Sequence, residues 1–474
     1  MTIDARHPLP GSRPLVVGAA RSGLAAARLL ARHGLDVRIA DAKLAGAEGA
    51  VRAGELVRQG VSSWDVDDPR ALEGRDFVVW SPGIPLTHPV ARAAHVAGLP
   101  LFSELEIGFL AAHAPFLGVT GTNGKSTTAH LAGALLRGAG RQAEVCGNIG
   151  RALCEVAESV PPTGLLVVEV SSFQLETVDR LKPFVATWLN LTPDHLDRHG
   201  GFDDYGALKQ RLFARQGEDD YAVWNADDPE VMKRRTGGGA WLEFSARHAV
   251  EEGAAAVGGR IRLGWRGGVE ELMEARELRL RGPHNLLNAL AAVATVLPVE
   301  PAPAAMRAVL REYGGLEHRL EAVATVAGVP FVNDSKATNT SSLEVALLSF
   351  ESPVVLIAGG RDKGQDFRPL APLVRERTLA AVLIGEGADR LAAHWAGANL
   401  LRAASLAEAV DLAFETARRA PPPSGGVRAG EHARPAPVLL SPGCASFDMF
   451  ADYEERGRRF KQEVARLAER EGGA

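Results

Sequence analysis

Apolar and polar positions alternate along this chain in a pattern that predicts short strands followed by helices. An apolar run at 14–17 leads into a glycine-containing turn, a helical pattern and a second strand that ends at Asp41. A further strand, "DFVVW", covers 76–80 and runs into the tight turn Ser81-Pro-Gly-Ile-Pro85. Strands that alternate with helices are typical of α/β folds with largely parallel sheets.

The alternation continues in two further blocks, which begin near Pro115 and near Leu316. Strands of the second block are predicted at 116–119, 165–170, 184–191 and 221–225, and its helices at 129–140 and 283–296. Strands of the third block are predicted at 329–334, 353–360, 380–385 and 437–443, ahead of a long charged helix. The Pro- and Gly-rich stretch 421–437 is predicted to be an exposed connection.

Composition favours a globular protein that acts on small molecules. The chain has 474 residues, of which 46% are apolar and 23% charged, a length that suggests two to four domains. Its net charge of −5 and the lack of a dense Lys/Arg block argue against a nucleic-acid partner. No apolar run reaches the ~18 residues of a membrane span and no secretory signal is visible, so we expect a cytoplasmic protein. Cys146, Cys154 and Cys444 lack metal-type pairing and are expected to be buried bystander thiols.

The stretch "GVTGTNGKSTTA" (118–129) ends like a phosphate loop, but its first glycine comes late. The usual loop reads G-x-x-x-x-G-K-[ST], which would require a glycine at Val119, and here the glycine stands at Gly121. The predicted strand before the loop and the predicted helix after it provide the setting that phosphate binding requires. We therefore predict a nucleoside triphosphate site, in which Lys125 offsets phosphate charge and Ser126 reaches a Mg²⁺ ion.

The first block carries a weaker glycine turn, Gly18-Ala-Ala-Arg-Ser-Gly23. Ala20 replaces the middle glycine of G-x-G-x-x-G, which weakens a dinucleotide interpretation. A phosphate-bearing ligand at the helix N-terminus is one interpretation, and a plain strand-to-helix turn is the other.

Acidic and histidine side chains gather at two strand ends of the second block. Glu169 ends an apolar strand, where it meets either a cation or a strong donor, or else points to solvent. The next strand is followed by a cluster of four such side chains, Asp194, His195, Asp197 and His199. The cluster is either a helix cap with surface histidines or a metal or phosphate site.

Three more polar side chains of this block have an interpretation that involves no function. By composition Lys209 is a solvated helix lysine. Asn285 and Asn288 are three residues apart on one helical face, where they could bind a base, although capping explains Asn285 nearly as well.

In the third block, the segments 333–339 and 359–364 follow strands, and each carries one lysine. A binding site for an anionic ligand explains these lysines better than turns without a function do.

Taken together, the strings "GTNGKST", "VEVSSFQLE", "NLTPDHLDRH" and "GPHNLLNAL" resemble the Mur ligases, ATP-dependent amide ligases of peptidoglycan precursor synthesis. Within that family, "SPGIP", "NDSKATNTSS", "GGRDKGQDF" and "SPGCASFDMFADYEERGRRF" resemble the branch that adds D-glutamate to UDP-N-acetylmuramoyl-L-alanine. The resemblance implies a role in cell wall biogenesis, and hence in cell shape and division, and we expect a monomer.

The resemblance also implies a three-domain α/β fold and a two-step reaction. The domains are an N-terminal Rossmann-like domain for the UDP-sugar (1–112), a central P-loop ATPase domain with a mostly parallel sheet (113–315), and a C-terminal Rossmann-like domain for the amino acid (316–474). In the reaction, the L-alanyl carboxylate attacks the γ-phosphorus of ATP to give an acyl phosphate. The amine of D-glutamate then displaces phosphate. Two Mg²⁺ ions would offset the charge of the triphosphate.

Site residues follow from the resemblance position by position. It implies that the phosphates and adenosine are held by Gly121, Thr122, Asn123, Gly124, Lys125, Ser126, Thr127, Asn285, Asn288, Arg319 and Asp334. Metal ligands would be Ser126, Glu169, His195 and a carbamylated Lys209, with Asn148 near the reacting carboxylate. Substrate contacts would come from Arg21, Ser22, Asp41, Lys43, Ser81, Gly83, Thr338, Lys363, Ser446, Phe447 and Tyr453.

Three rival functions stay open at this point. A folylpolyglutamate synthetase shares the ligase chemistry, but its chain would not have the block of over 100 residues that precedes the loop here. An NAD-dependent dehydrogenase would use Asp41 on the ribose, and Ala20 counts against it. A P-loop switch protein would leave Glu169 and the lysine loops unexplained.

Overall fold

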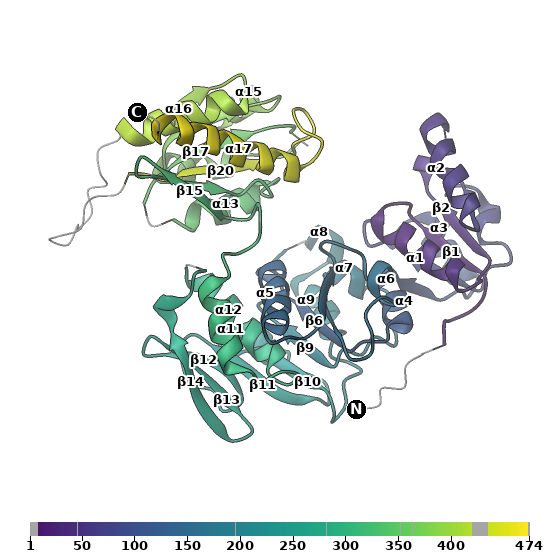
Figure 1. Ribbon diagram of the computed structural model, residues 1–474. Coiled ribbons are helices and arrows are strands. Elements are labelled where there is room, and N and C mark those ends of the chain that lie inside the picture. The colour runs from purple at the N-terminus through teal and green to yellow at the C-terminus, as the bar shows by residue number, and fades with distance from the viewer. Residues whose placement is uncertain are drawn as a thin grey trace. The chain divides into compact units, whose positions relative to one another are not determined.

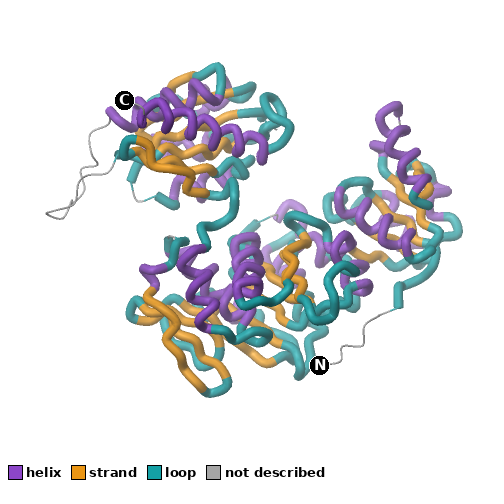
Figure 2. The backbone as a smooth tube through the Cα atoms, viewed as in Figure 1, coloured by secondary structure: helices purple, strands orange, loops and turns teal. Residues whose placement is uncertain are grey.

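The computed structural model describes residues 8–44, 46–194, 196–280, 282–350, 352–362, 364–419 and 435–472. It divides into two compact units, Met1–Tyr313 and Gly314–Ala474. The described residues form three sheets, two in the first unit and one in the second, each flanked by helices (Figures 1 and 2). The predicted three-part α/β fold is confirmed. The domain limits at 112 and 315 stay predictions, and the units divide close to the second.

The first sheet has five parallel strands in the order β3-β2-β1-β4-β5. The chain runs outward from β1 to β3 and returns to place β4 beside β1, so the strand order reverses between β1 and β4. Ligands of open α/β sheets bind at the carboxyl ends of strands beside such a reversal. The strands are β1 (Pro14–Val17), β2 (Val37–Ala40), β3 (Val61–Trp64), β4 (Phe77–Trp80) and β5 (Leu101–Ser103), and the helices α1 (Arg21–Arg32), α2 (Gly46–Arg58) and α3 (Pro89–Val96).

The second sheet has nine strands in the order β14-β13-β12-β11-β10-β9-β6-β8-β7. Pairing is parallel from β12 to β7, and β12, β13 and β14 pair antiparallel. The strands are β6 (Phe116–Thr120), β7 (Ala143–Gly147), β8 (Leu165–Glu169), β9 (Val185–Trp188), β10 (Tyr221–Asn225), β11 (Ala240–Ser245), β12 (Gly253–Val257), β13 (Arg260–Trp265) and β14 (Gly268–Glu274). The predicted strands β6, β8, β9 and β10 are confirmed, whereas β7 and β11 to β14 were not predicted.

Helices cover both faces of this sheet. On one face α5 (Lys125–Gly138), α11 (Pro283–Val296) and α12 (Pro303–Glu312) form a continuous apolar core with the strands (Figure 1). On the other face α4 (Glu104–Ala111), α6 (Leu153–Val156), α7 (Ser172–Leu175) and α9 (Phe202–Gln210) pack on the sheet. The short helices α8 (Leu196–His199) and α10 (Pro229–Lys233) complete this part. Both faces of the central strands are therefore buried, which explains their unbroken apolar sequences.

The second unit contains a six-stranded sheet in the order β15-β16-β20-β17-β18-β19. All pairs are parallel except β15 with β16. Helix α17 packs an apolar stripe of Phe460, Val464 and Leu467 on one face beside α16, as its i, i+4, i+7 spacing requires. The strands are β15 (Glu321–Val326), β16 (Val329–Asn333), β17 (Val354–Gly359), β18 (Thr378–Ile384), β19 (Leu400–Arg402) and β20 (Val438–Gly443). The helices are α13 (Thr340–Leu348), α14 (Ala371–Arg377), α15 (Ala388–His394), α16 (Leu406–Arg419) and α17 (Tyr453–Gly472).

Three further expectations concern the whole chain. The predicted connection at 421–437 lies largely outside the described residues, which resume at Pro435. Cys146, Cys154 and Cys444 are buried and free, as expected for bystander thiols. None of the described helices is both long and apolar enough to cross a membrane.

Glu104 is a buried carboxyl group that ties α4 to α6. Its Oε1 accepts a hydrogen bond from the Cys154 N–H at 2.6 Å, and its Oε2 has no hydrogen-bond partner among the described residues. Burial raises the pKa of Glu104 to about 7, and the hydrogen bond from Cys154 only partly opposes this shift. The carboxyl group is therefore more protonated in the folded than in the unfolded chain at mildly acidic pH.

We predict that Glu104 makes the first unit less stable as pH rises from about 4.5 to about 7. The sign follows because the folded state binds the extra proton across this range, and the loss is complete above the folded pKa. Glu104→Gln should remove a pH-dependent loss on the order of 3 kcal/mol between pH 5 and pH 8. Urea unfolding of both proteins at the two pH values measures it. Asp334, which also titrates near neutral pH, is common to both proteins and cancels in the comparison. Equal pH dependence of the two proteins would contradict the prediction.

Candidate active site

Four neighbouring strands of the second sheet bring the predicted chemistry to one edge. Strands β9, β6, β8 and β7 lie side by side and parallel, so their carboxyl ends lie at the same edge of the sheet. The glycine-rich loop follows β6, Glu169 ends β8, and Asn148 follows β7. Asn190 lies just beyond β9. The strand order therefore places the phosphate loop between Asn190 on one side and Glu169, with Asn148 beyond it, on the other.

The loop at 121–124 depends on both of its glycines. Gly121 and Gly124 have φ angles of 154° and 83°, which side chains rarely adopt. A Cβ atom on Gly124 would lie 2.2 Å from Oδ1 of Asn288, and one on Gly121 would lie 2.9 Å from Cβ of Leu189. The late glycine at 121 thus permits close approach of the loop to the end of β9. Lys125, Ser126 and Thr127 form the first turn of α5 directly after the loop.

Glu169 is the acceptor at the centre of a buried hydrogen-bond cluster. Its side chain is 2% exposed, which excludes the solvent-facing interpretation. Oε2 accepts from the Ser126 hydroxyl at 2.6 Å, and Oε1 accepts from Nδ2 of Asn148 at 2.7 Å. Ser126 and Asn148, which are predicted to serve the metal and the reacting carboxylate, therefore both contact Glu169. Hydroxyl and carboxylate oxygens are ligands that suit Mg²⁺, which usually takes one or two carboxylates together with substrate phosphates.

Two lysine side chains meet at the carbonyl oxygen of Gly121. Nζ of Lys125 donates to it at 3.0 Å and to the Thr122 carbonyl at 2.7 Å, and Nζ of Lys209 donates to it at 2.9 Å. Lys209 is 1% exposed, so its interpretation as a solvated helix lysine is wrong. Burial, and then the charge of Lys125, hold the pKa of Lys209 well below its ordinary value, against the attraction of Asp194 and Glu169. The side chain is therefore biased toward the neutral amine.

Tyr205 explains how a lysine of α9 becomes buried. It lies one helical turn before Lys209, and its ring centroid is 4.4 Å from Nζ of that lysine. Its hydroxyl donates to Oγ1 of Thr122 at 3.3 Å, so the same ring also contacts the loop. Burial raises the pKa of Tyr205 to about 12, which keeps the phenol neutral.

The segment after Asn190 is only partly described. His195 lies outside the described residues, as does the side chain of Asp197, so the role of His195 as a metal ligand stays a prediction. His199 is buried, with Nε2 3.0 Å from the Ser172 hydroxyl and its ring stacked on Tyr205. This is a packed position rather than the surface histidine of one interpretation.

The predicted adenine pair lies beside the loop. Nδ2 of Asn288 donates to Oδ1 of Asn285 at 3.3 Å, and the Thr128 hydroxyl donates to Oδ1 of Asn288 at 3.4 Å. Asn288 is buried against Gly124, and Asn285 is half-buried in the first turn of α11. The structure brings both amides to the phosphate loop, and base binding by them stays a prediction.

The first sheet collects the predicted UDP-sugar residues at its strand reversal. A Cβ atom on Gly18 would lie 2.5 Å from the Ser81 hydroxyl, so the turns after β1 and β4 touch. Oδ2 of Asp41 accepts from the Ala19 N–H at 2.6 Å and Oδ1 from the Lys43 N–H at 2.8 Å, so this carboxylate braces the turn. Ser22 is half-buried, and the side chains of Arg21 and Lys43 are exposed, as is Gly83.

Arg21 links this turn to the second sheet, since its Nη2 donates to the Asn148 carbonyl at 3.2 Å. Arg198 makes a second link, donating to the Ile84 carbonyl at 3.1 Å while it pairs with Glu176. Ile84 belongs to the "SPGIP" turn that carries Ser81 and Gly83. The two links connect predicted substrate turns with the residues around Glu169.

In the second unit, Asp334 is buried at the end of β16. Its Oδ2 accepts from the Ser441 hydroxyl at 2.8 Å, and its Oδ1 accepts from the Leu320 N–H at 3.2 Å. Burial raises the pKa of Asp334 to about 7. The carboxyl group thus braces the turn that carries Arg319, where His318 and Leu320 both have positive φ angles of 64° and 44°. Nucleotide binding by Arg319 and Asp334 stays a prediction.

The predicted D-glutamate residues lie at the ends of β16 and β20 and at the start of α17. Ser446 is buried, Phe447 is 57% exposed, and Thr338 is half-buried. The Tyr453 ring centroid lies 5.8 Å from Nζ of Lys336. Lys363 lies outside the described residues, and its role stays a prediction.

Two residues that sequence reasoning did not single out support these loops. Arg456 is buried, and its guanidinium donates to the Ser335 hydroxyl and carbonyl and to the Cys444 carbonyl at 2.9 to 3.1 Å. It thereby joins the loops after β16 and β20, and burial lowers its pKa to about 10. Asn190 bonds to the phosphate loop with both ends of its side chain. An arginine in a charged helix and an asparagine at a strand end give no sequence signal that separates them from solvated residues.

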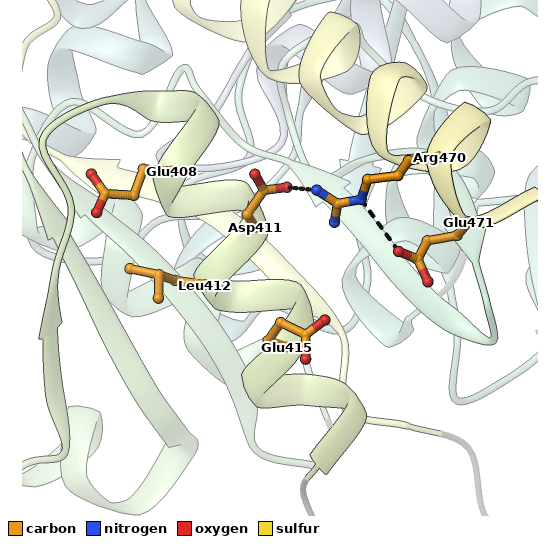
Figure 3. A pocket seen from close by; sticks show the side chains of 6 residues that line it. All are labelled: Glu408, Asp411, Leu412, Glu415, Arg470 and Glu471. Atoms are coloured by element: carbon orange, nitrogen blue, oxygen red, sulfur yellow. Dashed lines mark hydrogen bonds and ion pairs between the residues drawn. The ribbon is translucent and has the colours of Figure 1, made fainter.

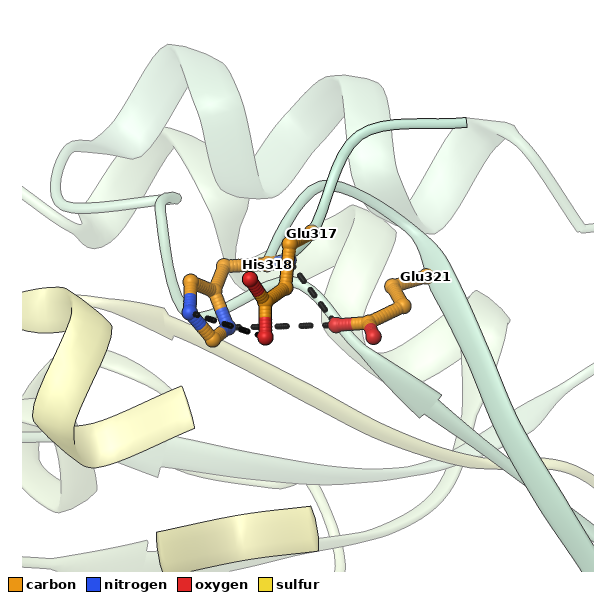
Figure 4. A group of neighbouring side chains, drawn as sticks. All are labelled: Glu317, His318 and Glu321. Carbon is orange, nitrogen blue, oxygen red and sulfur yellow. Dashed lines mark hydrogen bonds and ion pairs between the residues drawn. The ribbon is translucent and has the colours of Figure 1, made fainter. Parts of the chain in front are cut away.

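Other clusters of the described residues do not add to the site. One group of the described residues has ligand atoms close enough to surround a metal ion, namely Glu317, His318 and Glu321 (Figure 4). Lys461 pairs with both carboxylates, and Nδ2 of Asn333 lies 2.9 Å from Nδ1 of His318, so these atoms are already engaged. A surface hollow of about 640 Å³ lies between α16 and α17 (Figure 3). It is lined by Glu408, Asp411, Leu412, Glu415, Arg470 and Glu471, none of them a predicted site residue.

The fold and the loop define a nucleotide-binding α/β protein of the P-loop type. Its residues 119–296 match the model of the Mur ligase middle domain, and residues 318–420 match that of the Mur ligase glutamate ligase domain. The chain is 43% identical over 459 residues to the UDP-N-acetylmuramoylalanine–D-glutamate ligase of Pelotomaculum thermopropionicum, covering 96% of this chain and 97% of that protein. It is 42% identical over 466 residues to the protein of the same name from Pelobacter propionicus, covering 97% and 100%.

The chain therefore belongs to the Mur ligase family. Among solved structures, the UDP-N-acetylmuramate–alanine ligase of Thermotoga maritima superposes with a TM-score of 0.53 at 17% identity, covering 96% of this chain and 99% of that chain. This likeness agrees with the three-part α/β fold. The resemblance inferred from the motifs is confirmed.

We predict that Glu169→Gln raises the Mg²⁺ concentration needed for half-maximal activity by about 10-fold or more, since it removes the charge of the cluster. Titrating the ATP-dependent activity with Mg²⁺ measures this change. Glu106→Gln is the matched control, because Glu106 is also fully buried but accepts hydrogen bonds from three backbone N–H groups away from the loop. It should lower stability and leave the Mg²⁺ requirement unchanged. Equal Mg²⁺ requirements in both variants would contradict the prediction.

Proposed function

We propose that this chain joins D-glutamate to UDP-N-acetylmuramoyl-L-alanine in peptidoglycan precursor synthesis, using ATP. The observation that carries the proposal is the single sheet edge at which the phosphate loop, Glu169, Asn148 and Lys209 meet. The acceptor and the amino acid follow from relatives with about 40% identity over nearly the whole chain. The protein is an ATP-dependent amide ligase that forms ADP and phosphate.

The first step activates a carboxylate. An oxygen of the L-alanyl carboxylate forms a bond to the γ-phosphorus of ATP, the bond from that phosphorus to the β,γ-bridging oxygen breaks, and ADP leaves. In this proposal Lys125 and the first turn of α5 hold the phosphates and offset their charge. Asn148 orients the carboxylate from its place beside Glu169. Positioning and charge supply most of the catalysis of such a transfer.

The second step forms the amide. The amine nitrogen of D-glutamate attacks the acyl carbon, giving a tetrahedral intermediate that expels phosphate, and the nitrogen loses a proton. We assign the amino acid to Thr338, Lys363, Ser446, Phe447 and Tyr453, and the UDP-sugar to Arg21, Ser22, Asp41, Lys43, Ser81 and Gly83. Arg319, Asp334, Asn285 and Asn288 are assigned to the adenosine and phosphates.

ATP and Mg²⁺ are the cofactors of the family, and we propose two Mg²⁺ ions here. Ser126 and Glu169 would hold one of them, while His195 and the modified Lys209 would hold the other. The ions, when bound, would offset the charge of a carboxylate that meets a triphosphate. The oxygen donors of Ser126 and Glu169 fit such an ion.

We also propose that Lys209 is carbamylated. Its buried amine is biased toward the neutral form, which carries the lone pair that attacks the carbon of CO₂. A nitrogen–carbon bond forms, one carbon–oxygen π pair moves to oxygen, and the nitrogen releases a proton. The product is a carboxylate, which attracts the Lys125 ammonium. It would also provide an oxygen ligand for a metal.

We predict phosphate release when the protein is incubated with ATP, Mg²⁺, UDP-N-acetylmuramoyl-L-alanine and D-glutamate together. Release should fall to background when any one of these is omitted or when L-glutamate replaces D-glutamate. If both L-alanyl carboxylate oxygens carry ¹⁸O, one ¹⁸O atom should appear in each released phosphate, because the acyl phosphate transfers that oxygen. Mass spectrometry of the phosphate measures it.

Equal release with D- and L-glutamate would contradict the assignment of the amino acid. Phosphate free of ¹⁸O would contradict the acyl phosphate. Ligation of L-glutamate to a folate, in place of D-glutamate to the UDP-sugar, would identify the rival amide ligase.

A further inference from the structure

The Asn190 side chain is clamped to the phosphate loop by three hydrogen bonds. Its Oδ1 accepts from the N–H groups of Thr122 and Asn123, at 3.0 and 2.8 Å. Its Nδ2 donates to the Asn123 carbonyl at 3.1 Å. The Asn190 carbonyl also accepts from the Thr122 N–H at 3.1 Å. One side chain therefore uses both its acceptor and its donor on two consecutive residues of the loop.

The backbone around Asn190 is itself held in place. Nε1 of the buried Trp188 donates to the Asn190 carbonyl at 3.2 Å. Two residues further on, the Thr192 N–H donates to Oγ1 of Thr122, which in turn donates to the Thr192 carbonyl, both at 3.1 Å. The end of β9 thus forms a rigid frame against which the loop is fixed.

The clamp decides which backbone amides can face a phosphate. The N–H groups of Thr122 and Asn123 point at Asn190, so they are engaged before any nucleotide arrives. Amides of the first turn of α5, at Ser126 and Thr127, have no carbonyl of a preceding helical turn to bond. The start of α5 and Lys125 are therefore the groups placed to bind phosphate oxygens, whereas the amides of Thr122 and Asn123 are already bonded to Asn190.

Asparagine supplies both groups that this geometry needs at position 190. The two loop amides need an acceptor, and the Asn123 carbonyl, on the same side chain, needs a donor. Aspartate offers no donor and would add a negative charge beside the phosphates, whereas serine has one oxygen on a shorter side chain. The amide supplies both groups without charge.

We propose that Asn190 is a positioning residue for ATP, which holds the shortened loop in its phosphate-binding shape. The inference rests on the proposed ATP-dependent function. In it, the backbone amides of Thr122 and Asn123 do not bind phosphate directly. They hold the loop in shape by bonding to Asn190. The inference predicts that substitution of Asn190 lowers the affinity for the nucleotide and leaves the affinity for D-glutamate unchanged.

The test compares Asn190→Ala with the wild-type protein. Calorimetric titration with ADP and Mg²⁺ should show affinity that is weaker by roughly 10-fold or more, because three hydrogen bonds that fix the loop are lost. The KM for ATP should rise by a similar factor, while the KM for D-glutamate stays within about twofold. Asn190→Ser should also lose affinity, and it decides the question if the alanine variant does not fold.

Gln216→Ala is the matched control. Gln216 is another buried amide of the same sheet, and it donates to the carbonyls of Pro183 and Tyr221 at the opposite sheet edge. Its loss should lower thermal stability without changing the affinity for ADP. Wild-type affinity in a folded Asn190 variant, or equal losses in the Asn190 and Gln216 variants, would overturn the inference. Failure of the wild-type protein to bind ADP would instead overturn the proposed function.

Discussion

The carbonyl oxygen of Gly121 accepts hydrogen bonds from Lys125 and Lys209 at once, and the rest of the site is arranged around this contact. Two cations that share one acceptor repel each other, and the burial of Lys209 adds a desolvation penalty. The late glycine makes the contact possible, because Gly121 lets the loop lie against the end of β9. A neutral or carboxylated Lys209 relieves the repulsion, which connects the loop geometry to the proposed carbamate.

Sheet topology explains how a few side chains can form the candidate active site. Parallel strands β9, β6, β8 and β7 present their carboxyl ends at one edge, so residues far apart in the chain become neighbours. Asn190, Glu169 and Asn148 each come from a different strand end and fix one part of the site. Arg21 and Arg198 join this edge to the turns of the first sheet.

Much of the fold could be predicted from sequence, because buried parallel strands give continuous apolar runs between helices. The hairpin strands β13 and β14 escaped prediction, since their exposed faces carry charged residues that mask the apolar positions. At the site, the phosphate loop and Glu169 could be predicted, because each stands at the end of an apolar run that marks a strand. Composition could not reveal the burial of Lys209, which depends on a tyrosine one turn earlier and on a loop 88 residues away. Nor could it reveal Asn190 and Arg456, whose partners are mostly backbone groups that carry no sequence signal.

The most direct measurement is carbon-13 NMR of the protein equilibrated with ¹³C-labelled CO₂. A buried neutral amine that becomes a carboxylate beside Lys125 predicts one carbamate resonance in the wild-type protein. That resonance should be absent from Lys209→Arg, which keeps a cation that does not react with CO₂. A wild-type spectrum without a resonance that depends on Lys209 would contradict the carbamate, and with it the proposed resolution of the two-lysine contact.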